Sequence, residues 1–370
     1  MVLVLVLMGR PTRSVAVPFP LPSSLRGDFP PVAVAPGRDR EADEQLLKKK
    51  KPEPEQPQPQ SAAEEAVGVN PLNPRYSEYD PKQREHVYTR FCFDPRLDLD
   101  KESPYGPMRH THKTFGEGFP LYHSANILSV KIVASDYGYP LDIYGTVIAR
   151  EDLDRKCVYL FRRDKDNHPF VVLKDNSLIL TGPKRGLALC GSLFFEINLK
   201  VKDVHGREVK DERLSKGMLD INGITRQTSN FEYGVETDTL VSMHSTLEMN
   251  FAFVRDAVEG TVGIRILEGH VDFHGKIIAT TTRVLCEIVL HDSRANGLLT
   301  AGNNQVMQTA CRVVCVSVGE MLLVTLAPEG GDELSHHTVR FASKLNGCAA
   351  ENMVCGNYKM QVKVTWSIVM

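Results

Sequence analysis

The histidines of the segment "RHTH" at 109–112 have the spacing that best fits metal binding. His110 and His112 lie two positions apart, so on a β-strand they would share one face, and His123 follows downstream. A zinc site needs three or four ligands at dependable spacing, and a proline and a glycine flank this segment as they would a loop. We therefore predict solvated loop histidines and no metal site.

Five aspartates at the ends of predicted strands could gather around calcium in a β-sandwich: Asp152, Asp154, Asp164, Asp166 and Asp203. The chain has no Asp-x-Asp-x-Asp-Gly loop, and arginines and lysines are interleaved with these acids. Charge-paired loop tips are the prediction, with calcium binding as the alternative.

Two further patterns combine cations with other groups. "GPKRG" at 182–186 could offer backbone N–H groups to a phosphate, but it lacks the Gly-x-x-x-x-Gly-Lys-Ser/Thr pattern, so a turn is predicted. Tyr159, Phe161, Arg162 and Arg163 could stack on RNA, although decoration of an edge strand is favoured. The chain has no Gly-x-Ser-x-Gly elbow. We predict no catalytic, cofactor-binding or metal-binding residue.

The elements that carry these residues are predicted to be strands, because apolar residues alternate with period two beyond residue 120. In "FFEINLKVKD", Phe195, Ile197, Leu199 and Val201 share one face. "KMQVKVTWSIV" at the C-terminus and "TLEMNFAF" at 246–253 repeat the pattern. Short strands with one apolar face and frequent turns predict an antiparallel β-sandwich.

One phrase occurs twice, as "DIYGTVIARE" at 142–151 and as "DFHGKIIATT" at 272–281. We predict an internal repeat, residues 127–203 and 246–326, whose two similar halves pack together. Gly145 and Gly275 are expected where a missing Cβ permits a bulge or a close backbone approach. The alternative is that Asp142 and Asp272 begin two equivalent binding loops.

Composition is that of an ordinary soluble protein, with 42% hydrophobic residues, 24% charged residues and a net charge of −2. This balance argues against a nucleic-acid partner, and no apolar run is long enough to span a membrane. Eight cysteines without a Cys-x-x-Cys pair indicate reduced thiols. A cytoplasmic or nuclear location is favoured, with the chloroplast as the alternative.

The domain organisation follows from a change in composition along the chain. Residues 1–74 are rich in proline and charge and are predicted to be disordered. Residues 75–119 are expected to form a partly ordered lead-in, and residues 120–370 the sandwich domain.

Several stretches, among them "ILSVKIVASD", "LTGPKRGLAL" and "CGNYKMQVKVTWSIVM", resemble motifs of an uncharacterised domain family of grasses and occur in the same order as in that family. The resemblance covers about residues 75–370. Some relatives carry this domain behind a ribosome-inactivating rRNA N-glycosidase module, as in jasmonate-induced proteins, but the first 75 residues here are too short and proline-rich for that module. The resemblance implies an accessory β domain linked to stress, without catalytic residues to carry over.

The function predicted is a non-enzymatic binding or scaffold module in plant stress responses, with an unknown protein partner. One alternative is a translation-linked role as a relative of ribosome-inactivating proteins. The other is calcium-dependent docking to membranes.

Overall fold

The computed structural model describes residues 73–91, 97–116, 118–166, 171–174, 176–204, 207–208, 212–227, 234–302, 305–329 and 336–369. All of them belong to one compact unit, Glu65–Met370. The predicted disordered tail lies outside the described residues apart from its last two positions. Within the part described, no helix has both the length and the apolar character needed to cross a membrane.

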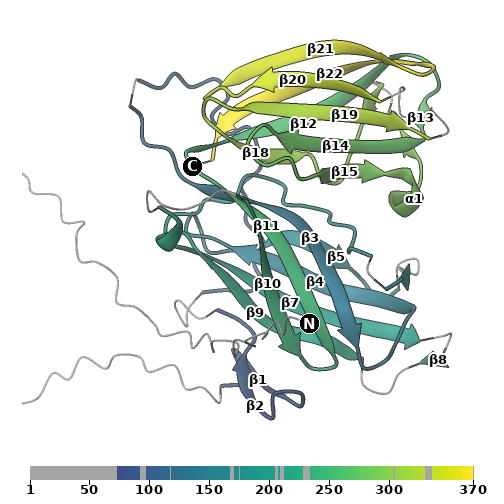
Figure 1. Ribbon diagram of the computed structural model, residues 1–370. Coiled ribbons are helices and arrows are strands. Elements are labelled where there is room, and N and C mark those ends of the chain that lie inside the picture. Colours follow the sequence, from purple (N-terminus) through teal and green to yellow (C-terminus); the bar gives the residue numbers. More distant parts are fainter. Residues whose placement is uncertain are drawn as a thin grey trace, which may run out of the picture. The chain divides into compact units, whose positions relative to one another are not determined.

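Two β-sandwiches follow one another along the chain (Figure 1), which confirms the predicted all-β antiparallel class. The first sandwich, residues 124–254, packs a sheet of order β5-β4-β7-β9 against a sheet of order β10-β11-β3. Its strands are β3 (Ser124–Ser135), β4 (Leu141–Arg150), β5 (Val158–Arg163), β7 (Ser192–Val204), β9 (Arg213–Asn222), β10 (Val235–Ser242) and β11 (Ser245–Val254).

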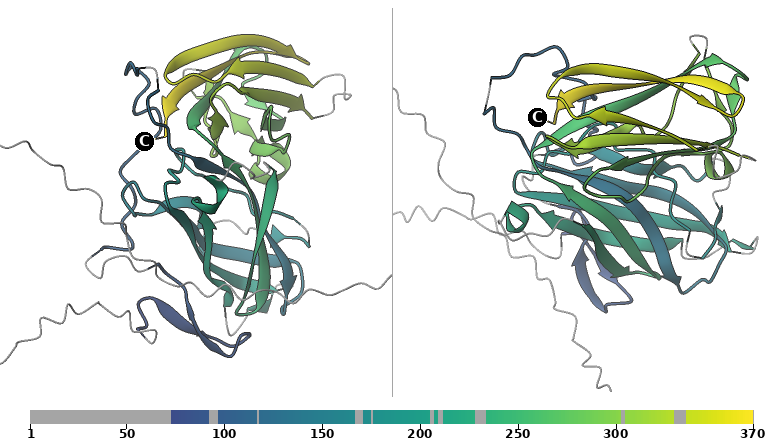
Figure 2. Two further views of the ribbon diagram at one scale, coloured as in Figure 1. Left: turned by 60° about the vertical axis from the view of Figure 1, so that its left-hand side comes forward. Right: turned by 45° about the horizontal axis from the view of Figure 1, so that its top comes forward.

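The second sandwich, residues 257–368, has sheets of order β15-β14-β19-β20 and β18-β12-β22-β21. Figure 2 shows these two layers from two further directions. Its strands are β12 (Ala257–Glu268), β14 (Gly275–Thr281), β15 (Ile288–Asp292), β18 (Val313–Ser317), β19 (Met321–Pro328), β20 (His337–Ala342), β21 (Gly347–Cys355) and β22 (Tyr358–Ile368).

Short elements connect or extend these sheets. They are β1 (Ser77–Asp80), β2 (Glu85–Tyr88), β6 (Val171–Val172), β8 (Arg207–Glu208), β13 (Asp272–Phe273), β16 (Leu299–Thr300), β17 (Val306–Met307), the 3-10 turn η1 (Thr225–Gln227) and the helix α1 (Ser293–Asn296).

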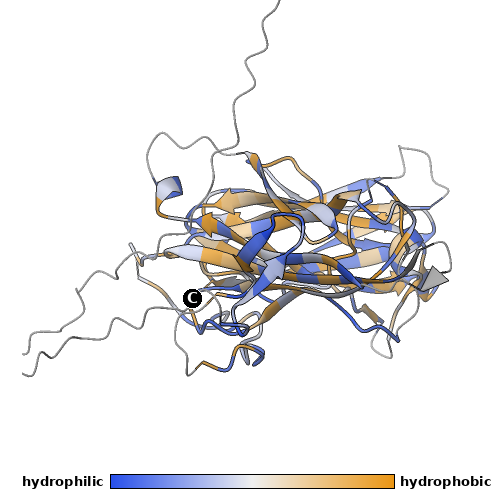
Figure 3. Cartoon of the chain, turned by 90° about the horizontal axis from the view of Figure 1, so that it is seen from below, coloured by the Kyte–Doolittle hydropathy of each residue, from blue (hydrophilic) through white to orange (hydrophobic). Residues whose placement is uncertain are grey.

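Each sandwich has its own hydrophobic core, formed by the alternating residues that the sequence predicts to face inward. Phe195 and Ile197 of β7 are buried in the first core, and Val364 and Trp366 of β22 are buried in the second. Apolar residues recur along the strands of both sandwiches in Figure 3. Burial of this apolar surface is the main source of stability of such sheets.

Three strands without a clear apolar stripe, β9, β10 and β21, were not predicted. β10 and β21 lie at sheet edges and are largely exposed, so their sequences need few apolar residues. In β9, Gly217 faces inward, and an added Cβ there would lie 2.8 Å from a methyl carbon of Leu240. The small residue that breaks the pattern therefore makes room for a neighbour.

Residues 97–116, which we call the strap, bond to both sandwiches. In the first sandwich, Cys157 donates its N–H to Lys101 O at 3.0 Å and accepts from Ser103 N at 2.9 Å. In the second, Arg109 Nη2 donates to Val369 O at 3.0 Å, and Thr111 O accepts from Gly347 N at 2.9 Å. The strap thus ties the two sandwiches by hydrogen bonds.

Candidate binding groove

A groove of about 600 Å³ lies between the two sandwiches. One wall is the edge strand β15, of which the consecutive residues Ile288, Val289 and Leu290 all line the groove. The other wall is the extended segment 176–180, of which every residue lines the groove. Because successive side chains of a strand point to opposite faces, a wall lined by consecutive residues presents its backbone edge. On the β15 side, the groove is therefore bounded by a backbone edge.

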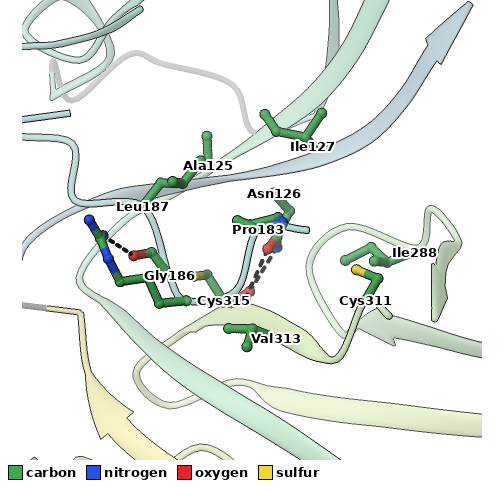
Figure 4. Close-up of a pocket in the computed structure, with 11 residues that line it drawn as sticks. Ala125, Asn126, Ile127, Pro183, Gly186, Leu187, Ile288, Cys311, Val313 and Cys315 are labelled. Carbon is green, nitrogen blue, oxygen red and sulfur yellow. Dashed lines mark hydrogen bonds between the residues drawn. The ribbon is translucent and has the colours of Figure 1, made fainter. Parts of the chain in front are cut away.

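The groove, which polar and apolar residues line together, continues into a smaller space. Ile127 of β3, Ile288 and Cys311 line both the groove and an inner cavity of about 10 Å³, which Figure 4 shows in close-up. A cavity of that size holds at most about one water molecule. The inner cavity is thus a small recess at the base of the groove.

A reciprocal amide contact joins the two sandwiches beside this recess (Figure 4). The Asn126 side chain accepts from Cys315 N at 2.9 Å and donates to Cys315 O at 2.8 Å. These are the two hydrogen bonds that a neighbouring backbone would make, so the Asn126 amide takes the place of a strand partner for β18. The contact holds β3 and β18 at a fixed separation next to the groove.

Buried charges also connect the two sandwiches, and we call this set of buried contacts the junction. Glu259 of β12 is fully buried and accepts from Gly186 N and from Met108 N of the strap, each at 2.7 Å. Arg185, also fully buried, forms an ion pair with Glu151, the residue after β4. Buried charges are costly unless they are paired and hydrogen-bonded, so this network favours one arrangement of the two sandwiches.

Burial sets the protonation tendencies of this region. It raises the pKa of Glu151 against the opposing effect of Arg185, and the pKa of Glu259 against its backbone N–H donors. Burial also raises the pKa of Cys311 to about 11 and that of Cys315 to about 12. Both thiols are therefore protonated near neutral pH and are weak nucleophiles there.

Two charged residues line the mouth of the groove, Asp292 and Arg294. Arg294 Nε lies 3.1 Å from Glu329 Oε1 in an ion pair. Asp292 caps α1 by accepting from Arg294 N at 3.0 Å. Within the described ranges Asp292 has no lysine or arginine partner for an ion pair, so its negative charge is available at the mouth.

The histidines singled out by spacing are not brought together. His110 N donates to Ser367 Oγ at 3.1 Å, His112 is exposed, and His123 Nδ1 accepts from Asp256 N at 3.0 Å. Burial lowers the pKa of His123, which favours its neutral form. The residues that the structure describes contain no group of three or more metal-ligating side chains.

The aspartates considered for calcium have individual partners or face solvent. Asp152 accepts from Gly191 N at 3.0 Å, and Asp154 accepts from Lys156 N at 3.1 Å. Asp164 and Asp166 are exposed beyond the end of β5. Asp203 lies in β7, where only its backbone is described.

In the two patterns that combine cations with other groups, Arg185 and Phe161 have structural roles. "GPKRG" is a connecting loop, as predicted, but its Arg185 is fully buried instead of facing a phosphate in solvent. Phe161 is in the core of the first sandwich, so it is not part of a stacking surface. Arg162 lies over the Tyr159 ring at 4.7 Å.

The paired phrase lies at matching places in the two sandwiches. Gly145 has φ +118° and Gly275 has φ +151°, and an added Cβ at either would overlap a carbonyl oxygen of the neighbouring strand. This confirms the predicted close backbone approach at both glycines. Asp142 is the second residue of β4 and Asp272 is the first of β13, and Asp272 accepts from Thr300 Oγ1 at 2.7 Å.

The groove itself had no signal in the sequence analysis. Ile288 and Leu290 lie in the region beyond residue 120 for which strands were predicted, and Asp292 and Asn126 were not singled out. The reciprocal contact of the Asn126 amide with the Cys315 backbone joins residues far apart in the chain, and nothing near Asn126 in the sequence indicates it.

By fold, the chain is an all-β protein of two antiparallel sandwiches. It belongs to the family described as Domain of unknown function (DUF6598), whose model matches residues 124–364. This supports the resemblance to an uncharacterised family. No curated protein sequence matches the chain.

Two solved structures show a distant likeness. The paired C2 domains of Extended-Synaptotagmin 2 are 11% identical with a TM-score of 0.22, covering 74% of this chain and 99% of that one. Human GIVD cytosolic phospholipase A2 is 8% identical with a TM-score of 0.24, covering 68% of this chain and 31% of that one. Scores this low do not describe a shared overall arrangement, so nothing about function follows from them.

Proposed function

We propose that the chain is a non-enzymatic binding module and that the groove between its sandwiches is the binding site. The observation that carries this proposal is the groove of about 600 Å³ with apolar residues of β15 and of the segment 176–180 along its two walls. Binding sites are commonly concave and mostly apolar, with a few polar groups and volumes of about 300–1,000 Å³. The junction of buried charges and the Asn126 contact would keep such a site formed without ligand.

The chemical groups in the groove support binding over catalysis. Its thiol, Cys311, is buried and has a pKa raised to about 11. Its guanidinium, on Arg294, is engaged by Glu329, and its carboxylate, on Asp292, serves as a helix cap. A nucleophile activated by a neighbouring base would need a different arrangement.

Binding of the fluorescent apolar dye ANS to the full chain tests whether the groove is an accessible site. Val289 is 41% exposed and lines the groove, so Val289→Arg should abolish most of the dye signal. Val354→Arg is the matched control, because Val354 is 59% exposed on β21, in another sheet. Equal dye binding by wild type and Val289→Arg would refute the proposal.

The finer roles suggested by the sequence also remain proposals. A scaffold in plant stress responses requires a protein partner for the groove. A translation-linked role predicts depurination of ribosomal RNA by the purified chain, and we expect none. Calcium-dependent membrane docking predicts sedimentation with anionic liposomes only when calcium is present. We expect no such dependence, because four of the aspartates considered for calcium, Asp152, Asp154, Asp164 and Asp166, have other partners or lie exposed.

A further inference from the structure

The edge strands β5 and β15 are equivalent in the two sandwiches. Thr146 of β4 pairs with Arg162 of β5, and Lys276 of β14 pairs with Asp292 of β15. Each pairing continues for one more residue pair and then contains a bulge: Leu160 is the extra residue in β5, and Leu290 is the extra residue in β15. The same register and the same bulge make each residue of β15 comparable with one residue of β5.

In the first sandwich, this edge is already occupied by other parts of the chain. The carbonyl of the bulged residue Leu160 accepts from Thr181 N at 2.8 Å. One residue before β5, Cys157 exchanges two backbone hydrogen bonds with the strap, which runs parallel to it beside Glu102. Two separate parts of the chain, the strap and the residues around Thr181, therefore cover the edge at β5.

In the second sandwich, the corresponding edge is open at Leu290 and Glu287 among the residues that the structure describes, while Asp292 N donates to Asn296 Oδ1 at 3.2 Å. Leu290 corresponds to Leu160, and Glu287 corresponds to Cys157. Beyond the pairing of β15 with β14, no described backbone group bonds to either of them. The groove runs along this edge, and Val289 is 41% exposed within it. An unpaired edge next to apolar side chains is a template for an added strand.

The charges at the two edges have opposite signs. In the first sandwich, Arg162 lies 3.8 Å from Glu102 of the strap. The equivalent residue of the second sandwich is Asp292, and it has no cationic partner within the part of the chain described. A segment added along β15 would meet a carboxylate at Asp292, where the first sandwich presents the Arg162 guanidinium to Glu102 of the strap. Charge complementarity therefore calls for a lysine or arginine in the added segment.

We infer that β15 takes an extended segment of a partner protein, paired through its backbone, with apolar side chains in the groove and a basic residue opposite Asp292. The inference rests on the proposed function of the groove as a binding site and adds the chemistry of its ligand. Backbone pairing supplies affinity in this mode of recognition, and alternate side chains supply specificity.

Panning of a phage-displayed library of random 12-residue peptides on the full chain tests the inference. The peptides retained should carry alternating apolar residues and at least one lysine or arginine. Their binding should protect the amides of 288–292 from hydrogen exchange. Val289→Arg should abolish binding of the selected peptides, because its long charged side chain would fill the groove.

Charge variants separate the basic contact from the rest of the site. Asp292→Asn keeps a good helix cap but removes the charge, so a selected basic peptide should bind about two- to fivefold more weakly. Asp166→Asn, at an exposed aspartate beyond β5, should leave binding unchanged. Replacing the basic residue of the peptide by glutamine should weaken binding to wild type but not to Asp292→Asn.

Several outcomes would overturn the inference. These are selected peptides without basic enrichment, protection confined to other strands, or no peptide retained above the Val289→Arg background. Dimerisation of the chain that protects 288–292 would assign the edge to a second copy instead. If ANS binds the groove but no peptide does, the inference fails and the proposed function stands. If neither binds, both fail.

Discussion

Gly145 and Gly275 each have a positive φ, and each lies where the carbonyl oxygen of the neighbouring strand occupies the position of a Cβ. The oxygen belongs to Asn198 of β7 in one sandwich and to Ala327 of β19 in the other. Two unrelated strands would rarely need the same residue at the same register. The relationship supports the proposal that residues 124–254 and 257–368 descend from one duplicated unit. The bounds predicted for the repeat were wrong, however, because β11 (Ser245–Val254), most of which was predicted to open the second half, pairs with β3 in the first sandwich.

Alanine at either glycine should destabilise the protein by about 2–4 kcal/mol, because the new Cβ must displace backbone and adopt a strained φ. Urea unfolding of Gly145→Ala and Gly275→Ala measures this. Gly263→Ala is the matched control: its Cβ would have only Lys363 O within 4 Å, at 3.9 Å, so stability should change by less than about 1 kcal/mol. Two near-neutral variants would contradict the close approach.

The two sandwiches are expected to unfold together. Trp366 is the only tryptophan of the chain and is fully buried in the second sandwich, so its fluorescence reports that sandwich. Gly145→Ala acts in the first sandwich, yet it should lower the urea midpoint seen by Trp366 as much as the midpoint seen by circular dichroism. Separate midpoints would mean that the junction does not couple the two cores.

Glu259→Gln should destabilise the chain by about 1–3 kcal/mol. An amide nitrogen would then face a backbone N–H, of Gly186 or of Met108, so a buried donor would lose its acceptor. Thermal or urea unfolding measures the loss. Glu268→Gln is the control, since Glu268 forms an exposed ion pair with Lys359 and should cost at most about 1 kcal/mol. Equal effects of the two substitutions would argue against a buried junction.

The contribution of Glu78 to stability should depend on pH. Partial burial of Glu78 raises its pKa, but Lys216 and Arg213 together lower it more, so the pKa falls below its ordinary value. A carboxylate of this kind stabilises the folded state above its unfolded pKa, and the effect is lost as pH falls through the folded pKa. Glu78 and its two cationic partners are partly exposed, so the effect on the free energy of unfolding is at most about 1 kcal/mol.

Urea midpoints of wild type and Glu78→Gln, compared between about pH 6 and pH 3, test this linkage. The wild type should be the more stable protein at the upper end, and the difference should disappear at the lower end. A difference that grows as pH falls would contradict the sign.

Thiol accessibility should distinguish Cys348 from the buried cysteines. Cys348 of β21 is exposed, whereas Cys157, Cys311, Cys315 and Cys355 are buried. In a Cys92→Ser background, limiting iodoacetamide followed by peptide mass mapping should find Cys348 alkylated well before these four. Burial raises the pKa of Cys315 to about 12, so it should react only when urea unfolds the chain. Early alkylation of Cys315 would contradict its placement.

The sandwich strands could be predicted where one face is apolar and buried and the other is polar and exposed. Phe195 to Val201 in β7 and Met360 to Ile368 in β22 alternate strictly, and the structure buries the predicted faces. Edge strands such as β10 and β21 bury little, so their composition carries little signal. The repeated phrase also predicted the tight backbone approach at its two glycines.

The groove and the junction could not be predicted, because both depend on contacts between residues distant in sequence. Arg185 looks like a surface residue of a turn until Glu151 and the strap enclose it. Asn126 looks like an ordinary polar strand residue until β18 comes alongside. Whether the backbone edge of β15 stays unpaired depends on which other segments lie beside it, and the sequence of β15 does not encode that.

The strap has a practical consequence for expression of the family domain. The region that the family shares begins at residue 124, whereas the strap at 97–116 supplies a hydrogen bond to Glu259 and another to the penultimate residue, Val369. A recombinant fragment cut at the family boundary would leave those acceptors facing solvent. Cloning that starts ahead of the β1–β2 hairpin would retain them.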